Sequence, residues 1–191
     1  MARQFLDTLR TQINNLLPDN SSGLITPAIV RTLMTDTVDS LVSDDATINR
    51  ESATPAVLAT QITPTQITGI ADTAGVDTNM DGTSANAANG SFLSGAVAGR
   101  SYRLVMYATV ELAINAQINL GVRVNGLLSG FTVQANGLGA TKPISLVLFA
   151  AFGSQPAGAT VECMAWTPDG VDNVTFNEFL AQYVIQPTNN P

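Results

Sequence analysis

The chain has 191 residues, of which 45% are hydrophobic and only 12% charged, and its formal net charge is −7. A typical soluble domain has roughly 25% charged residues. The sequence contains no histidine and one cysteine, Cys163, which excludes a Ser-His-Asp triad, a histidine-ligated metal, an intrachain disulfide and a thiolate zinc cluster. We expect no nucleic-acid partner and no membrane insertion, because the chain is acidic and lacks an apolar run of roughly 20 residues.

Residues 1–45 predict two short amphipathic helices. Apolar residues recur at three- to four-residue spacing, and Thr26-Pro27 is a suitable start for the second helix. Two such helices bury too little apolar area to be stable alone, so we expect a region that attaches the protein to a partner rather than one that covers the rest of the chain. The residues expected to form the attachment surface are Phe5, Leu9, Ile13, Leu16, Val30, Leu33 and Leu41.

Residues 46–90 are rich in Ala, Thr, Pro, Asn and Gly and have few large apolar side chains. Pro55 and Pro64 disfavour a continuous helix. We therefore expect an extended stalk or linker, in which Ile62, Ile67 and Ile70 pack only if several chains run side by side. From residue 32 to residue 99 the net charge is −7, whereas from residue 100 onward it is −1.

Residues 91–191 contain about six to eight strand signals without intervening helices. Tyr102–Leu112 is a long β-prone run, and Asn125-Gly126 is typical of a two-residue hairpin turn. Residues 143–152 are apolar almost throughout, as expected of a central strand covered on both faces. The predicted fold class is α+β, mainly β: short N-terminal helices, an extended stalk and a C-terminal antiparallel β-sandwich of the jelly-roll type.

A calcium loop is one candidate site. Asp77, Asn79 and Asp81, followed by Gly82, match the start of the Asp-x-Asn-x-Asp-Gly pattern, in which side-chain oxygens converge on a hard cation. The twelfth position, which a bidentate Glu normally occupies, is Ala88. The pattern therefore also fits an ordinary solvated acidic turn, which we favour, and we expect no metal and no cofactor.

Other reactive residues point to structure more than to catalysis. We expect Cys163 to be a buried thiol, because it has an acidic neighbour and no histidine to activate it. Trp166 and the other aromatic residues of the C-terminal half could stack on sugars, but their strand positions favour packing. No two carboxylates are spaced so as to single out a glycosidase pair. We therefore expect a protein that is not an enzyme.

Turn residues of the β-rich half are candidates for contact with another molecule, because loops on rigid sandwiches commonly bind ligands. The polar turns at 125–126, 136–139 and 167–173 are rich in Asn, Gly and Thr. The candidate contact residues are Asn125, Asn136, Asp169 and Asp172.

Two stretches resemble known families. The phrase Asp-Asn-Ser-Ser-Gly-Leu-Ile-Thr-Pro-Ala-Ile-Val-Arg, which opens residues 19–41, resembles a segment near the N terminus of tail fibres and head fibres of tailed bacteriophages. Residues 101–110, 156–162 and 179–185 resemble a tumour-necrosis-factor-like or complement-like jelly roll, a domain that caps many phage fibres as a trimer.

The resemblance implies a virion protein made in the host bacterial cytoplasm. Its partners would be two further copies of itself, other proteins of the tail or capsid, and a glycan or protein of the host surface. We expect a homotrimeric fibre, with a tail fibre favoured, in which residues 1–45 attach, residues 46–90 form the stalk and residues 91–191 project. The alternatives are a capsid decoration or head fibre protein that stabilises the shell and, from a different class, a polysaccharide-degrading enzyme.

Overall fold

The computed structural model describes most of the chain from residue 45 onward as strands. The residues that it describes are 30, 45–76, 82–95, 99–139, 141–170 and 173–186. Among them, Val30 is the one residue in a helix. The predicted attachment residues Phe5, Leu9, Ile13, Leu16, Leu33 and Leu41 lie outside the described residues.

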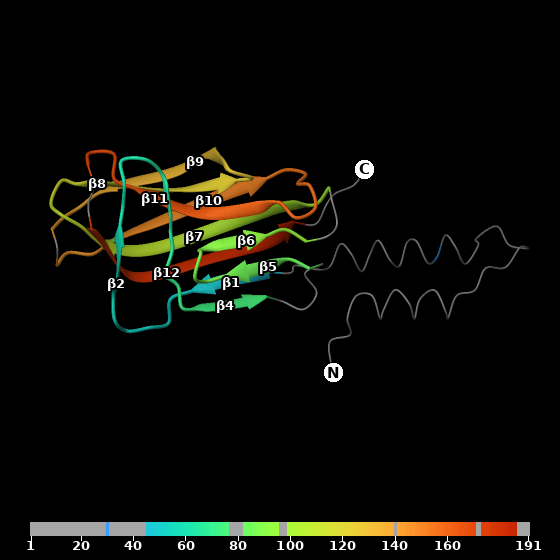
Figure 1. The fold of residues 1–191 in the computed structure, drawn as a ribbon, viewed down its shortest axis with the longest axis horizontal. Coiled ribbons are helices and arrows are strands. Elements are labelled where there is room, and N and C mark those ends of the chain that lie inside the picture. Colours follow the sequence, from blue (N-terminus) through green and yellow to red (C-terminus); the bar gives the residue numbers. More distant parts are fainter. Residues whose placement is uncertain are drawn as a thin grey trace, which may run out of the picture.

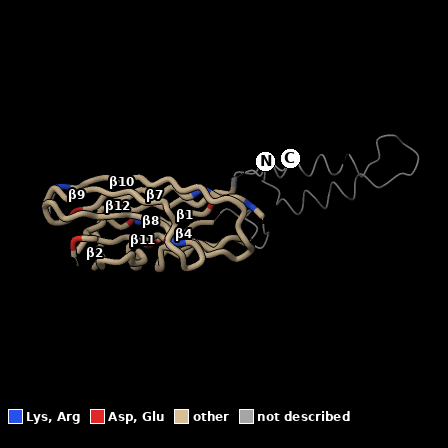
Figure 2. The backbone as a smooth tube through the Cα atoms, turned by 90° about the horizontal axis from the view of Figure 1, so that it is seen from above, with Lys and Arg blue, Asp and Glu red and all other residues tan. Residues whose placement is uncertain are grey.

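The strands form two antiparallel sheets that lie face to face (Figures 1 and 2). The first sheet has the order β10 (Ile144–Phe152), β7 (Ser101–Glu111), β12 (Asn173–Gln186), β1 (Asp45–Asn49) and β4 (Thr73–Val76), with β2 (Ala56–Ala59) also paired to β12. The second sheet has the order β5 (Ser84–Asn86), β6 (Ser91–Leu93), β11 (Thr160–Trp166), β8 (Gln117–Val124) and β9 (Leu127–Asn136), with β3 (Thr65–Gln66) also paired to β11.

The strand order is that of a jelly roll. The hairpin β8–β9 is the innermost of four nested antiparallel pairs, followed outward along the chain by β7–β10, β6–β11 and β1–β12. Successive pairs fall in alternate sheets, so the nested ribbon is rolled into a sandwich. The predicted mainly β sandwich is therefore confirmed for the described residues.

Alternating burial explains why the long strands pack as they do. Along β7 every second residue, from Tyr102 to Val110, is buried between the sheets. Within this layer, Tyr183 stacks on Tyr102 with ring centroids 4.7 Å apart and on Phe92 with centroids 5.3 Å apart. Phe92 belongs to the second sheet and both tyrosines to the first, so the stack joins the two layers.

The turn at Asn125-Gly126 has the geometry that its sequence predicts. Both residues have positive φ, 49° at Asn125 and 80° at Gly126, and the flanking Val124 and Leu127 are paired across the hairpin. The Asn125 side-chain oxygen also accepts a hydrogen bond of 3.0 Å from the Thr160 amide. This turn therefore fixes both the hairpin and its contact with β11.

The structure corrects the expectation of an extended stalk over residues 46–90. The described part of that range supplies β1 to β5, and Ile67 and Ile70 are buried in the core of their own chain rather than between chains. Pro55 and Pro64 each immediately precede a short strand, β2 and β3. In this segment, Pro and Gly residues separate short strands that are divided between the two sheets. The segment has the composition of a linker because so many of its residues lie between strands.

The expectation for residues 143–152 is also corrected. β10 is the edge strand of the first sheet, and its burial alternates along the strand. Leu146, Leu148, Ala150 and Phe152 face the core, while the residues between them face away from it. The continuous apolar run therefore reflects one covered face and one exposed face that is also largely apolar.

Substitution of Gly90 tests whether the predicted stalk region is part of the sandwich. A Cβ at Gly90, where φ is +56°, would lie 2.2 Å from the backbone oxygen of Ile67. We expect Gly90→Ala to lower the free energy of unfolding by about 1–2 kcal/mol for the left-handed backbone and by about another 1–3 kcal/mol for the steric clash. Urea denaturation measures both.

Gly69→Ala is the matched control, because Gly69 has a similar φ of +68° but nothing within 4 Å of an added Cβ. It should show the backbone cost alone. Equal losses for the two variants would contradict the packing of residues 67 and 90 against each other.

Candidate functional site

The outer face of the first sheet exposes large apolar side chains on three neighbouring strands. Phe149 and Val147 of β10 are 69% and 44% exposed, and Leu180 of β12 is 39% exposed. Val105 and Tyr107 of β7, which lies between these strands, are partly exposed on the same face. We call these five residues the apolar face.

The strand register places these side chains next to one another. Val147 lies opposite Tyr107, and Tyr107 lies opposite Leu180, so the three form one row across the sheet. Phe149 lies opposite Val105 in the next row. Directly opposed side chains in a sheet are about 5 Å apart. The apolar face is therefore one continuous patch.

A hydrogen-bonded cluster borders the patch on one side. The Tyr107 hydroxyl donates to a Glu178 carboxylate oxygen at 2.8 Å, and the Thr109 hydroxyl donates to the same oxygen at 2.9 Å. The Tyr107 hydroxyl, and then the Thr109 hydroxyl, hold the pKa of the Glu178 carboxyl below its usual value. The border is therefore charged at neutral pH, and its tyrosine ring belongs to the apolar face.

Polar residues border the patch on the opposite side. Ala151, Arg103, Val184 and Asp45 occupy the next row of the sheet, and Arg103 is exposed. One row inward, Gln182 donates a hydrogen bond of 2.5 Å to Asp45. The apolar face thus lies between a carboxylate cluster and a row that contains one arginine and one aspartate.

A second apolar patch lies on β9 at the hairpin. Leu127 is 76% exposed, and Leu128 and Phe131 are also exposed. The Phe131 ring contacts Phe152 of β10 edge to face, with centroids 5.7 Å apart. Leu128 lies opposite Arg123 on the outer face of the second sheet, so we call Leu127 and Phe131 alone the hairpin patch. It lies beside the edge strand of the first sheet, not within the apolar face.

The predicted contact turns are divided between the two ends of the sandwich. The chain enters β1 at Asp45, which pairs with Val184 near the end of β12. Gln186 pairs with Ser101 at the start of β7. The backbone oxygen of the preceding residue, Arg100, accepts a hydrogen bond from the backbone amide of Gln155, which lies in the loop that leads into β11. β11 begins beside Asn125. Asn125 therefore lies at the end where the described chain enters and leaves, which we call the entry end.

Asn136 and Asp169 lie at the opposite end, which we call the far end. Asn136 pairs with Gln117 at the start of β8, and the Asp169 carboxylate accepts a hydrogen bond of 3.3 Å from the Gln117 amide. Asp172 lies outside the described residues. Asn125 and Asp169 both use side-chain oxygens for internal hydrogen bonds. The structure does not bring the predicted contact residues together into one site.

The other candidate sites differ in what the structure says of them. The calcium candidates Asp77, Asn79 and Asp81 lie outside the described residues, and within the described part of the chain no group of three or more acidic, histidine or cysteine side chains is placed to hold a metal ion. Cys163 is buried, and burial, together with the neighbouring Glu162 charge, raises the pKa of its thiol to about 12. The thiol is therefore unreactive at neutral pH.

The described carboxylates have separate structural partners. Glu162 forms a two-point ion pair with Arg123, Glu178 binds Tyr107, and Glu111 accepts from Asn177 at 3.0 Å. Among the described helical residues, no segment is long and apolar enough to cross a membrane.

Sequence reasoning missed Val147 and Phe149 as surface residues. The sequence feature that could have identified them is the largely apolar run of residues 143–152, which also fits a strand covered by protein on both faces. In the described chain, the second sheet covers one face of this strand. The opposite face of the strand is exposed and belongs to the apolar face.

Comparison with known proteins gives structural likenesses only. No family model matches the sequence, and no curated protein matches it. The globular domain of the zebrafish complement 1qA protein is 15% identical, with a TM-score of 0.48, and the match covers 78% of this chain and 100% of that chain. The PRD1 vertex protein P5 is 13% identical, with a TM-score of 0.46 and coverage of 76% and 73%.

The Eiger tumour necrosis factor from S. frugiperda is 11% identical, with a TM-score of 0.45 and coverage of 78% of this chain and 97% of that chain. These likenesses are too distant to assign a function, so the jelly-roll description rests on the strand order.

The Glu178 cluster has a pH dependence that can be measured. The folded-state pKa lies below the unfolded value, so the carboxylate contributes stability above the unfolded pKa, and this contribution is lost as the pH falls through the folded pKa. We expect Tyr107→Phe to raise the pKa of Glu178 toward its usual value, since one donor to the carboxylate is removed. Side-chain NMR titration measures the shift.

Tyr183→Phe is the control, because the Tyr183 hydroxyl is buried without a hydrogen-bond partner among the described residues. It should leave the Glu178 titration unchanged. A Glu178 pKa unaffected by Tyr107→Phe would contradict the cluster.

Proposed function

We propose that this protein is a structural, non-catalytic component of a tailed-phage virion and that it works as a homotrimer. The observation on which the proposal rests is the apolar face. Monomeric proteins seldom leave a continuous row of large apolar side chains on the outer face of a sheet. Here Phe149 and Val147 of β10 and Leu180 of β12 are exposed on either side of β7. The proposed partner for this surface is a second copy of the same chain, which is present wherever the protein itself is present.

Two different patches favour a ring over a simple twofold dimer. A twofold interface uses the same patch on both subunits, whereas a ring uses two different patches that complement each other. The apolar face and the hairpin patch are separate surfaces, on the first sheet and on β9. If the hairpin patch of one copy packs against the apolar face of the next, a rotation of one third of a turn per copy closes a ring of three. Three copies are proposed because the sequence resembles trimeric fibre domains.

Polar groups at the border suit contact between copies. Arg103 and the Glu178 carboxylate lie on opposite sides of the apolar face. Charged groups at the rim of an interface fix the orientation of the partner more than they add affinity.

The virion role is proposed from the sequence. Residues 19–41 resemble the N-terminal segment of phage fibres, so residues 1–45 are the proposed attachment to other virion proteins. A tail fibre is the first candidate, and a capsid decoration or head fibre protein is the second. The described strands of residues 45–93 belong to the sandwich, so a projecting stalk is not included in the proposal.

Charged substitutions in the apolar face test self-association. We expect the unmodified protein to have a mass of three chains in light scattering at micromolar concentration. Phe149→Asp and Leu180→Asp should each raise the dissociation constant by about a hundredfold or more, because an unpaired buried charge costs about 3–5 kcal/mol. Circular dichroism checks that the variants remain folded.

Leu138→Asp is the matched control, since Leu138 is an equally apolar, exposed residue at the far end. It should leave the mass unchanged. Leu127→Asp separates the two geometries: it dissociates a ring that uses the hairpin patch but leaves a face-to-face dimer intact. A monomeric mass for the unmodified protein at micromolar concentration would overturn the proposal.

Copy number in purified virions distinguishes the two locations. Quantitative mass spectrometry against a major capsid protein should give tens of copies for a tail fibre and hundreds for a decoration protein. Absence of the protein from purified virions would contradict both.

A further inference from the structure

The outer face of the second sheet carries the one tryptophan of the sequence on a floor made by a glycine. Trp166 of β11 lies opposite Asn119 of β8, and Gly121 lies two residues further along β8 on the same face. A Cβ at Gly121 would be 2.9 Å from Cζ3 and 3.1 Å from Cη2 of Trp166. The six-membered ring of Trp166 therefore lies over Gly121, in space that any other residue at position 121 would fill.

The tryptophan is only partly buried, although it is the largest apolar side chain of the protein. Its ring lies along the sheet and not in the core, because the inner face at this level is formed by Ala165 and Leu120. Partial exposure at this position leaves an aromatic surface accessible from solvent.

Amide and hydroxyl groups lie on one side of the ring. Gln134 of β9 occupies the same row as Asn119 and Trp166, about 10 Å from the tryptophan at ordinary strand spacing. Gln117 donates a hydrogen bond of 2.8 Å to Gln134 Oε1, which orients the exposed Gln134 amide. Thr132, opposite Gly121, is also exposed.

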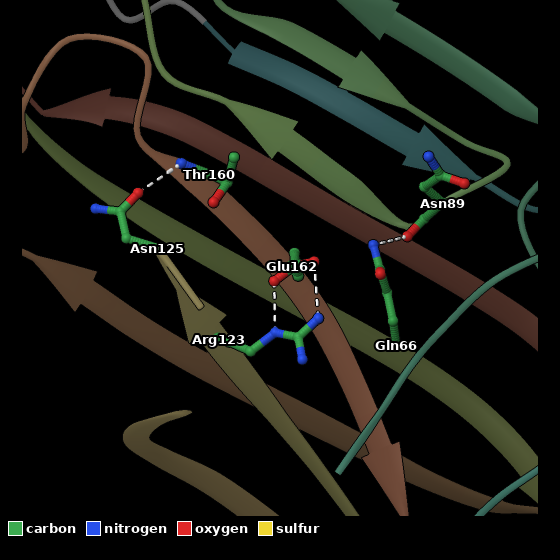
Figure 3. Close-up of polar contacts among 6 residues, drawn as sticks. All are labelled: Gln66, Asn89, Arg123, Asn125, Thr160 and Glu162. Atoms are coloured by element: carbon green, nitrogen blue, oxygen red, sulfur yellow. Dashed lines mark hydrogen bonds and ion pairs between the residues drawn. The ribbon is translucent and has the colours of Figure 1, made fainter. Parts of the chain in front are cut away.

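A fixed ion pair lies on the other side. Arg123 donates to Glu162 through Nε at 2.5 Å and through Nη2 at 2.9 Å, and both residues occupy the row beyond Gly121 (Figure 3). The Arg123 and Glu162 side chains remain 31% and 17% exposed. Two-point pairing holds both groups in one geometry, so their outward-facing atoms are pre-positioned for a ligand.

We propose that this face binds carbohydrate, with Trp166 as the stacking platform. A sugar ring has an apolar face of C–H groups, which packs on an aromatic ring, and a rim of hydroxyl groups that both donate and accept hydrogen bonds. Gln134, Thr132 and the Arg123–Glu162 pair supply donors and acceptors on two sides of the platform. A neutral glycan fits best, because the two charges of the ion pair already neutralise each other.

The site is compatible with the proposed homotrimer but does not depend on it. The apolar face belongs to the other sheet, and the hairpin patch lies on the side of β9 where Phe131 contacts Phe152 of that sheet, so association through these two patches leaves Trp166 accessible. Because the saccharide site and the self-association patches lie on separate surfaces, saccharide binding and self-association are measured independently. Either proposal can fail without the other. In a trimer, three copies of the platform would also raise the avidity for a repetitive polysaccharide.

Intrinsic fluorescence gives a direct test, because Trp166 is the single tryptophan of the sequence. The intact protein is titrated with neutral mono- and oligosaccharides of glucose, galactose, mannose, rhamnose and N-acetylglucosamine. We expect at least one saccharide to change the emission of Trp166 in a saturable way. No saturable change with any member of the panel at high millimolar concentration overturns the proposal.

Variants then locate the site by calorimetry with the saccharide that binds. We expect Trp166→Ala to weaken binding by about tenfold or more, equivalent to about 1.4 kcal/mol, and Trp166→Phe to retain part of it. Gln134→Ala, an exposed substitution that should not disturb folding, is expected to weaken binding as well. Unchanged affinity in both Trp166→Ala and Gln134→Ala overturns the proposal.

Phe149→Asp is the control, because it removes an exposed aromatic residue from the other sheet. Calorimetry should give the same affinity per chain as the unmodified protein, while light scattering reports its effect on self-association. Loss of saccharide binding in folded Phe149→Asp, with Trp166→Ala still binding, would place the sugar on the apolar face and contradict the assignment to Trp166.

Discussion

The apolar layer between the two sheets is the constraint on which the other features of the molecule depend. It includes the ring stack of Tyr102, Tyr183 and Phe92, which links β7 and β12 of one sheet to β6 of the other. Burial of this layer assigns every second residue of a long strand to the interior and fixes the strand register. The intervening residues are then free to determine how each outer face interacts. The apolar face and the tryptophan platform are two such outcomes on one scaffold.

The two outer faces follow different chemical patterns. The first sheet exposes Phe149 and Val147 on an edge strand, beside residues whose polar groups lie at the border. The second sheet places a glycine under its exposed aromatic ring and an ion pair beside it. The exposed apolar side chains of the first sheet suit contact with another protein surface. The aromatic ring and polar groups of the second sheet suit a ligand with many hydroxyl groups. The proposed self-association and the proposed saccharide binding therefore draw on the outer faces of different sheets of one sandwich.

The sequence predicted the parts of the fold that depend on local signals. The β-prone run Tyr102–Leu112 and the Asn125-Gly126 turn are decided by neighbouring residues, and the structure has both, as β7 (Ser101–Glu111) and as the β8–β9 turn. The short strands β1 to β5 were missed because Pro55, Pro64 and several glycines are typical of a linker, and the pairing partners of these strands are up to about 140 residues away in the chain. The placement of β10 at an edge is likewise a property of topology. Trp166 was recognised as a possible sugar contact, but its glycine floor depends on the pairing of two distant strands.

The direction in which the chain enters the sandwich has a mechanical consequence. Asp45 begins β1 at the entry end, and β1 lies antiparallel to β12 through five consecutive residue pairs. A pull between residue 45 and the far end acts along the strands, so it loads the β1–β12 hydrogen bonds together in shear instead of opening them one by one. Resistance to such a pull is a kinetic property, set by the rate of unfolding under load. A sandwich tethered in this way is suited to hold its position while solvent flow or a bound surface drags on its opposite end.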